Sequence, residues 1–240
     1  DKIDAPVDYI CKGEGETLPD FLLNGDDRLF KEKMFCNDIN SLPLPDYEMF
    51  NGIPFERSHL LDGKVLPYHS SRGCPYRCAF CLVSSQPSGV RIRYKVNEDL
   101  KYLKDTYSPD IFFICDELLP YYDKRWRDSW GDFRHPFFAY IRADISDYQL
   151  EWLIDRGMVA CAFGVESGDE SYRNTVLKKN LNDSDIYRTV EILNKNNVKY
   201  APFFMTDTPG ETFAVKAKTR KMAREIGGIP FIWKYENLTV

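Results

Sequence analysis

The stretch Ser71-Arg-Gly-Cys-Pro-Tyr-Arg-Cys-Ala-Phe-Cys-Leu82 holds three cysteines, Cys74, Cys78 and Cys81, in a C-x3-C-x2-C spacing. Three thiolates this close along the chain can bind one soft-metal centre without help from the rest of the fold. A structural zinc site normally takes four protein ligands, and an iron–sulfur cluster usually takes four cysteines. Three cysteines on a four-iron cluster would leave one iron without a protein ligand, and that iron could bind a small molecule.

Two simpler interpretations of these cysteines stay open. A zinc knuckle would need a fourth ligand, and the nearest histidine is His69. Alternatively, the three cysteines are grouped by chance. Each of the other four cysteines is expected to be a small buried apolar residue rather than a ligand: Cys11, Cys36, Cys115 and Cys161.

After this stretch, short apolar runs alternate with segments of helical periodicity. Strands are expected at 66–71, 110–115, 137–142, 158–165, 199–205 and 229–235, with 90–96 as a loop extension before a helix. Helix starts are indicated by Asn97 as an N-cap, by the capping box Ser146-Asp-Tyr-Gln149, and by Asp183. Strands that alternate with helices favour a parallel sheet built from right-handed βαβ units.

Polar residues stand where these strands end. The cysteine stretch follows the first strand, Asp116-Glu117 follow the second, Arg142 ends the third, Glu166-Ser167 follow the fourth, and 206–211 follow the fifth. Parallel α/β barrels place their chemistry at the C-terminal ends of the strands. The polar residues and the cysteines are therefore expected at the same end of the sheet.

The cysteine stretch resembles the cluster-binding loop of the radical S-adenosylmethionine (SAM) enzymes, with Arg72-Gly73 before it and the aromatic Phe80 beside its third cysteine. The resemblance covers 66–240 well and 1–50 loosely. It implies an α/β fold, a partial (β/α)6 TIM-like barrel with parallel strands behind a short N-terminal extension. It also implies a 4Fe–4S cluster on the three cysteines, whose open iron chelates SAM.

The resemblance assigns SAM contacts as well. Asp116-Glu117 stand where many members have a Gly-Gly-Glu that accepts from the SAM amino group, and which carboxylate does so here is left open. The segment "GVESG" resembles the motif of strand four, which implies SAM contacts for Glu166 and Ser167.

The remaining implied SAM contacts are Phe80 near adenine, Arg142 toward the SAM carboxylate, and Lys179 after the strand-four motif. For Arg142, a structural salt bridge is the alternative. The turn ending in Thr208-Pro-Gly-Glu211 departs from the family, where glycine usually stands at the position of Thr206 or Asp207.

The first part of the chain resembles the cobalamin-associated branch of the family. "VDYICKGEGE" is similar to the exit from a cobalamin-binding domain, but the D-x-H-x-x-G loop that would ligate cobalt is absent from this sequence. We expect 1–23 to be the tail of an upstream domain, 24–65 to be a linker rich in Asp, Asn, Gly and Pro, and 66–240 to be the barrel, truncated at its C-terminus. The chain is thus expected to be a fragment.

Composition limits the other possibilities. The chain has 240 residues, 43% of them hydrophobic and 29% charged, and a net charge of −5 without a basic block, so binding to nucleic acid is not expected. No run approaches the roughly 18 apolar residues of a membrane span, and the first residues, Asp1-Lys-Ile-Asp-Ala-Pro6, are not expected to act as a signal segment. Seven cysteines, three of them grouped, indicate metal binding in a reducing compartment, expected to be the cytoplasm.

The implied activity is reductive cleavage of SAM to a 5′-deoxyadenosyl radical, which abstracts hydrogen from an unknown small-molecule or peptide substrate. An external flavodoxin- or ferredoxin-like protein would donate the electron, and cobalamin-dependent methyl transfer is a further option. The alternatives are a non-enzymatic zinc or iron–sulfur module, which serves structure or electron transfer, and an inactive fragment.

Overall fold

The computed structural model describes residues 13–25, 31, 34–50, 56–58, 61–85 and 89–236. The chain divides into two compact units, Asp1–Leu42 with Asn237–Val240, and Pro43–Glu236. In the first unit, the described residues form a 3-10 helix, η1 (Gly15–Thr17), and the helix α1 (Leu18–Asn24). The backbone of Glu14 donates to the carbonyl of Met34. The stretch 1–12, part of the expected tail of an upstream domain, lies outside the described residues.

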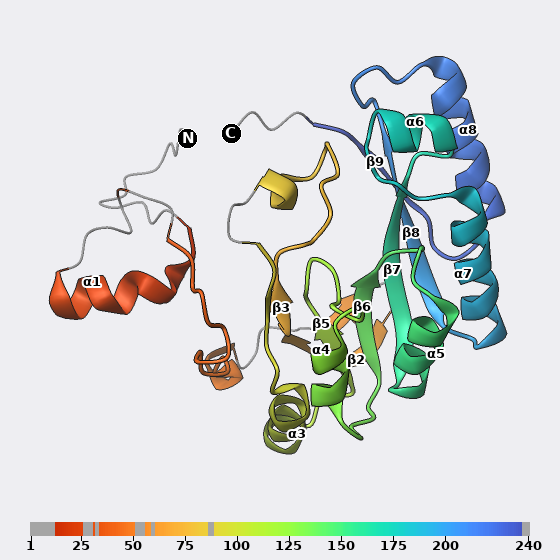
Figure 1. Cartoon of the computed structure of the whole chain (residues 1–240). Helices are drawn as coiled ribbons and strands as arrows, with labels where there is room; N and C mark the ends of the chain where they lie inside the picture. Colours follow the sequence, from red (N-terminus) through yellow and green to blue (C-terminus); the bar gives the residue numbers. More distant parts are fainter. Residues whose placement is uncertain are drawn as a thin grey trace. The chain divides into compact units, whose positions relative to one another are not determined.

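The second unit is built on a seven-stranded sheet with the order β1-β2-β5-β6-β7-β8-β9. The strands are β1 (Glu56–Ser58), β2 (Leu61–Tyr68), β5 (Ile111–Ile114), β6 (Phe137–Ile141), β7 (Met158–Glu166), β8 (Lys199–Thr206) and β9 (Phe231–Lys234). Neighbours from β2 to β9 are parallel, and β1 is an antiparallel edge. The six parallel strands form a curled half-barrel (Figure 1), which confirms the predicted partial TIM-like barrel.

Helices connect the parallel strands. They are α3 (Val96–Tyr107), α4 (Lys124–Trp130), α5 (Asp147–Asp155), α6 (Glu170–Thr175), α7 (Asp183–Lys195) and α8 (Phe213–Glu225), with the 3-10 turns η2 (Tyr47–Phe50) and η3 (Leu82–Ser85). Figure 1 shows α7 and α8 along the outer side of β7 and β8. Apolar side chains at helical spacing, such as Ile186, Val190 and Leu193, face the sheet and are buried.

The first parallel strand differs from the expectation. β2 begins at Leu61, inside the range assigned to a linker, and ends at Tyr68. Ser71 and Arg72 instead form a short strand, β3 (Ser71–Arg72), which pairs antiparallel with β4 (Arg91–Ile92), a stretch predicted as loop. This ribbon was not predicted because neither of its two-residue strands is long enough to give an alternating pattern.

The predicted N-cap Asn97 is also wrong. The helix α3 begins one residue earlier, at Val96, with Lys95 as its N-cap. The Asn97 side chain is engaged elsewhere, since its Nδ2 donates to Asp132 at 3.3 Å. By contrast, the predicted capping box at the start of α5 is confirmed, with Ser146 and Gln149 bonded to each other's backbone.

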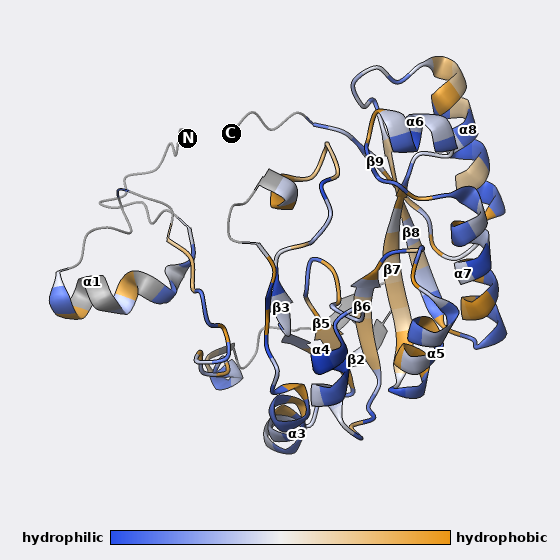
Figure 2. Cartoon of the chain, in the orientation of Figure 1, coloured by the Kyte–Doolittle hydropathy of each residue, from blue (hydrophilic) through white to orange (hydrophobic). Residues whose placement is uncertain are grey.

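Two apolar clusters lie on opposite faces of the sheet. The larger cluster packs the outer face against the helices and includes Leu66, Phe112, Ile114 and Phe163. The smaller cluster lies on the inner face, with Val65, Phe138, Ala160, Ala162 and Ala201 as its buried members. Figure 2 shows β7 as mainly apolar, whereas hydrophilic residues run along α7 and α8. The strands are thus apolar on both faces, as expected for a parallel sheet.

The caps of α5 and α7 allow a matched stability test. Ser146→Ala removes the side chain that accepts from Gln149 N and should lower the free energy of unfolding by about 1 kcal/mol. Asn182→Ala, at the N-cap of α7, removes a side chain that makes no capping bond and should cost only a few tenths of that. Urea unfolding measures both, and equal losses would contradict the assignment of the caps.

Candidate functional site

The cysteine loop leaves the sheet at the C-terminal end of β2 and is closed at its base. The β3–β4 ribbon pairs Ser71 with Ile92 and Arg72 with Arg91, so both ends of the loop are held together. Gly73 has φ +86°, and a side chain there would stand 2.3 Å from the carbonyl oxygen of Gly89. Only glycine fits this close approach in that backbone conformation. Further along the loop, Ala79 N donates to Leu177 O at 3.0 Å.

The three loop cysteines lie close enough to interact electrostatically. Burial raises the pKa of the Cys74 thiol, and Cys81 and Cys78 raise it further. Burial also raises the pKa of Cys78, whereas the cations of Lys179 and Arg142 act in the opposite direction. The six described cysteines are free thiols. The loop therefore presents three thiols to one region, with two positive side chains beside them.

Within the described ranges, no three or more His, Cys, Asp or Glu side chains are grouped so that they could hold one metal ion. Around a single tetrahedral zinc, sulfur ligands lie about 3.8 Å apart, given a Zn–S distance of about 2.3 Å. In an iron–sulfur cluster each cysteine binds a different iron, so the cysteine sulfurs stand further apart than they do around one zinc ion. The described side chains are therefore not arranged for a single metal ion. Three cysteine thiols on one loop are the kind of ligand that an iron–sulfur cluster takes.

Asp116 lies beneath the loop and is fully buried. Its Oδ1 accepts from Ser70 N at 2.7 Å and Ser71 N at 2.9 Å, and its Oδ2 accepts from Ser70 Oγ at 2.5 Å. Trp126 Nε1 in turn donates to Ser70 Oγ at 2.9 Å. Burial raises the pKa of Asp116 to about 7, against the effect of these hydrogen bonds. Asp116 therefore anchors the backbone where the cysteine loop begins, and its carboxylate does not face solvent.

Glu117, the next residue, has the opposite environment. Its side chain is exposed, and its Oε2 accepts from Gly73 N at 3.0 Å. This bond holds the carboxylate beside the first turn of the cysteine loop, one residue before Cys74. Of the acidic pair, Glu117 is the member that a small molecule can reach.

Arg142, just past the end of β6, is buried and joins three segments. It pairs with Asp144 at 2.9 Å, donates to Lys179 O at 2.9 Å and to Asn180 O at 3.2 Å. Its guanidinium carbon lies 3.7 Å from the centroid of the Tyr76 ring, within the cysteine loop. The structural salt bridge considered for Arg142 is thus present, with Asp144 as its partner. The Arg142 side chain also connects the cysteine loop to the barrel through Tyr76.

Glu166 and Lys179 form a buried ion pair at the end of β7, with 2.7 Å between Oε1 and Nζ. Lys179 Nζ lies 5.7 Å from the centroid of the Phe80 ring. A side chain at Gly164 would stand 1.9 Å from Glu166 Oε1 and 2.5 Å from Lys179 Nζ, so glycine leaves the room for the pair. Glu166 also has φ +67°, a strained conformation for a residue with a side chain.

Ser167 does not join this group. It is buried, and its Oγ lies 3.2 Å from Thr219 Oγ1 on α8. Its carbonyl accepts from Arg173, whose fully buried guanidinium also binds Leu181 O at 2.8 Å and pairs with Asp183 at 2.5 Å. The sequence analysis did not single out Arg173. No sequence pattern indicates that the carbonyls of Ser167 and Leu181 will surround this arginine and allow its burial. Arg173 supports the loop that carries Lys179.

The turn after β8 explains a departure noted in the sequence. Asp207 has φ +62°, the left-handed conformation that glycine adopts without strain. Its carboxylate pairs with Lys216, and Glu211 accepts from its backbone N–H at 2.5 Å. These contacts hold Asp207 in a backbone conformation that favours glycine.

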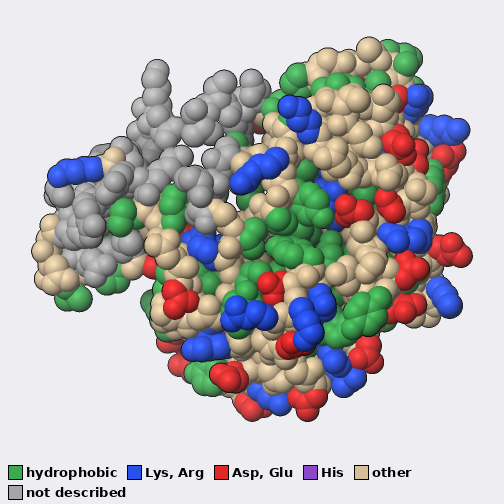
Figure 3. Space-filling view, viewed as in Figure 1, with side chains coloured by type: hydrophobic (Ala, Val, Ile, Leu, Met, Phe, Trp, Pro, Cys, Tyr) green, Lys and Arg blue, Asp and Glu red, His purple; other side chains and the backbone are tan. Residues whose placement is uncertain are grey.

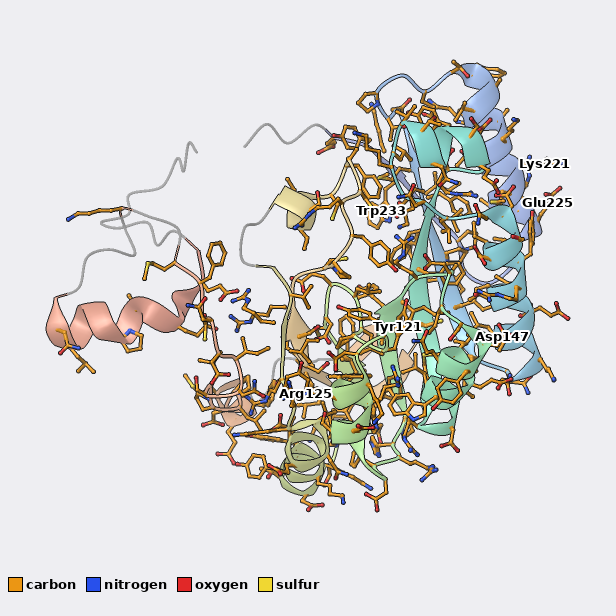
Figure 4. The ribbon with its side chains drawn as sticks, in the orientation of Figure 1. Tyr121, Arg125, Asp147, Lys221, Glu225 and Trp233 are labelled. Carbon is orange, nitrogen blue, oxygen red and sulfur yellow. The ribbon has the colours of Figure 1, made fainter. Side chains whose placement is uncertain are left out.

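The structure therefore gathers most of the predicted residues at one end of the barrel. The cysteine loop, Glu117, Arg142 and the Glu166–Lys179 pair with Phe80 are linked by the contacts above. Asp116 supports this group from below, and Ser167 faces α8. Figure 4 shows the side chains of the described residues in this view, with Lys221 and Glu225 of α8 pointing outward on the far side of the sheet.

No protein-family model matches the chain, and no curated protein matches its sequence. Solved structures do match its fold. The cobalamin-dependent SAM radical enzyme OxsB, with aqua-cobalamin and SAM bound, has a TM-score of 0.63 and 18% identity, covering 89% of this chain and 35% of that chain. The radical SAM methyltransferase TsrM from Kitasatospora setae, with cobalamin and a 4Fe–4S cluster bound, has a TM-score of 0.63 and 12% identity, covering 72% and 34%.

Coproporphyrinogen III oxidase (HemN) from Escherichia coli, a radical SAM enzyme, matches with a TM-score of 0.53 and 14% identity, covering 73% of this chain and 45% of that one. This chain has the radical SAM fold. It spans about a third of the OxsB and TsrM chains and less than half of the HemN chain. Among the described residues, no helix is long and apolar enough to cross a membrane.

The environment of Asp116 predicts a pH-dependent stability. Because its folded pKa of about 7 lies above its ordinary value of 3.8, the native state binds the proton more tightly than the unfolded chain does. Stability should therefore fall as pH rises through this window, by roughly 2–3 kcal/mol between about pH 5 and pH 7.

Asp116→Asn is the matched variant, because the amide oxygen can still accept from Ser70 N and Ser71 N. It should lose this part of the pH dependence. The measurement is the free energy of unfolding of both proteins across that range. Parallel curves for the two proteins would show that Asp116 is ionised in the same way in the folded and unfolded states.

Proposed function

We propose that this chain binds a 4Fe–4S cluster through Cys74, Cys78 and Cys81, and binds SAM beside it, as a radical SAM enzyme domain. The observation that carries the proposal is the closed three-cysteine loop at the C-terminal edge of a six-stranded partial barrel. The edge also holds Glu117 and the buried Glu166–Lys179 pair. When bound, such a cluster supplies an electron and an open iron position for reductive cleavage of SAM to a 5′-deoxyadenosyl radical.

The chain's own residues would bind and orient SAM. Glu117 is the proposed acceptor for the SAM ammonium, because its carboxylate is exposed beside the cysteine loop while that of Asp116 is buried and occupied. Glu166, Lys179 and Phe80 supply polar atoms and an apolar ring on the other side of the loop. Arg142 and Ser167 are proposed as positioning residues, since Arg142 packs on Tyr76 of the cysteine loop and Ser167 faces α8.

The substrate, the electron donor and the role of cobalamin belong to the proposal as well. Hydrogen abstraction requires a substrate in the barrel and one electron from a flavodoxin- or ferredoxin-like donor. The matches to OxsB and TsrM favour a link to cobalamin, whose cobalt ligand would not come from a D-x-H-x-x-G loop of this chain. The free state of the six described cysteines supports a reducing compartment such as the cytoplasm.

The deciding experiment is anaerobic reconstitution with iron and sulfide, followed by reduction and electron paramagnetic resonance with and without SAM. A four-iron signal that shifts on addition of SAM is expected, because the iron without a cysteine ligand can accept the ligand. Cys81→Ala should abolish the signal, and Cys36→Ala, which removes a cysteine outside the loop, should leave it intact.

Other outcomes distinguish the alternatives. A cluster signal that does not respond to SAM would favour an electron-transfer module. Stoichiometric zinc with little iron in anaerobically purified protein would favour a structural metal site, and either result would overturn the proposal.

Glu117→Gln should weaken SAM binding by about tenfold or more, because it removes the charge from a charge-assisted hydrogen bond to the ammonium. Asp116→Asn should change the SAM affinity much less. Calorimetric titration of SAM into the reconstituted variants measures both dissociation constants. A larger loss for Asp116→Asn than for Glu117→Gln would reverse the assignment.

A further inference from the structure

The inner face of the half-barrel is lined mainly by aromatic rings. Because side chains alternate along a strand, the inner face of each strand is set by every second residue. The buried inner-face cluster is flanked by partly exposed Phe113, Tyr140, Phe203 and Phe231. We call the following set the aromatic floor: Phe113, Phe138, Tyr140, Phe203, Phe231 and Trp233.

The rings of the floor touch one another from β5 to β9. Phe113 and Phe138 have ring centroids 5.0 Å apart, and Phe113 and Tyr140 5.7 Å. Phe203 and Phe231 are 5.6 Å apart. Phe231 is also stacked on Trp233 with an interplanar angle of 12°.

Small residues on β7 allow the two halves of the floor to meet. Tyr140 on β6 and Phe203 on β8 are not on neighbouring strands, yet their ring centroids are 6.3 Å apart. Ala162 on β7, in register with Tyr140, is fully buried beneath them. A larger side chain at Ala162 would separate the rings, so the sequence of β7 makes the floor continuous.

The surface of the aromatic floor that faces away from the sheet is open to solvent. Trp233 is 61% exposed, and the other floor residues except Phe138 are half-buried. In the space-filling view of Figure 3, hydrophobic side chains gather in the hollow at the middle of this face. Figure 4 places Trp233 on the side of the sheet away from α8.

Between the two ends of the strands, none of the described residues on the inner face from β5 to β9 carries a charge. The nearest charged residues on that face are Lys199 at the start of β8, and Arg142 and Glu166 at the strand ends. The polar groups at the floor are the Cys115 thiol, the indole N–H of Trp233 and the Tyr140 hydroxyl. The Tyr140 hydroxyl makes no hydrogen bond to another described residue. A carboxylate or other anion placed on the floor would lose part of its hydration without a cationic partner among the described floor residues, which is costly.

The floor leads directly to the proposed SAM site. Tyr140 and Arg142 lie on the same face of β6, and Ala162 and Gly164 lie on the same face of β7. The strand register shifts before Glu166, but its carboxylate lies over Gly164 on that face. A molecule resting on the rings would therefore have one edge near the Glu166–Lys179 pair and the cysteine loop. This is where a radical formed from SAM could reach it.

We propose that the substrate of this site is an uncharged molecule with a planar, conjugated ring system, which stacks on the aromatic floor and hydrogen-bonds to Tyr140. The inference rests on the proposed function, and adds the chemical class of the substrate. Flat rings gain most from offset stacking on aromatic side chains, beyond the apolar area that they bury. The neutral lining is complementary to a neutral ligand.

The test uses three probes, titrated calorimetrically into the full chain reconstituted with its cluster. What the three probes share is the fused two-ring framework, since the carboxylate carbon of the third is additional. They are 2-naphthol, which is planar and neutral, decahydro-2-naphthol, which is saturated, and 2-naphthoate, which is planar and anionic. 2-Naphthol should bind about tenfold more tightly than either of the others, because only it combines a flat ring with zero charge.

Variants locate the binding. Phe203→Leu keeps an apolar side chain and should weaken 2-naphthol binding about three- to tenfold, with little effect on decahydro-2-naphthol. Tyr140→Phe should weaken both hydroxylated neutral probes. Tyr148→Leu removes an exposed aromatic residue of α5, on the helix side of the sheet, and should change nothing. Circular dichroism and the cluster signal confirm that each variant is folded.

Other results would overturn the inference. Equal affinity for 2-naphthol and decahydro-2-naphthol would identify a general apolar face, of the kind that another polypeptide segment covers. Tightest binding of 2-naphthoate would refute the neutral class. Both results can be obtained in a sample whose cluster responds to SAM, so they leave the proposed function standing. Ring-selective binding in a sample that forms no cluster would support the floor and overturn the proposed function.

Discussion

The arrangement of the candidate site depends on the contact between the buried Asp116 carboxylate and the backbone of Ser70 and Ser71. These bonds fix the point at which β2 ends and the cysteine loop begins. Ser70 also accepts from Trp126, so the anchor is tied to the core beneath α4. Both carboxylate oxygens are occupied, and solvent does not reach them. The neighbouring Glu117 faces outward instead, and its carboxylate accepts from Gly73 N.

A second set of contacts holds the cysteine loop from the other side. Arg142 stacks on Tyr76 and binds the carbonyls of Lys179 and Asn180, while Ala79 bonds to Leu177. The segment around Lys179 is itself supported by the buried guanidinium of Arg173. Buried arginines are suited to this role because one planar group can satisfy several carbonyl oxygens at once. The loop is therefore positioned before any cofactor contributes to its stability.

The two faces of the sheet serve different purposes. The outer face packs mostly aliphatic and aromatic side chains against amphipathic helices, and this packing stabilises the half-barrel. The inner face keeps alanines and a glycine on β7 and places rings around them. Small residues at the centre bring the rings of β6 and β8 together. They also leave space for the Glu166–Lys179 pair at the strand end.

The sequence by itself determined the alternation of six strands with helices, the cysteine spacing and the capping box, because each is a local pattern. It also placed the polar residues at one end of the barrel. Only the tertiary structure decided which of them are accessible. Partners distant in the sequence occupy three of these residues. Ser70 binds Asp116, Thr219 binds Ser167, and the carbonyl of Lys179 binds Arg142. The β3–β4 ribbon and the aromatic floor likewise depend on pairing between distant segments. Burial and pairing are set by packing, and no local pattern encodes them.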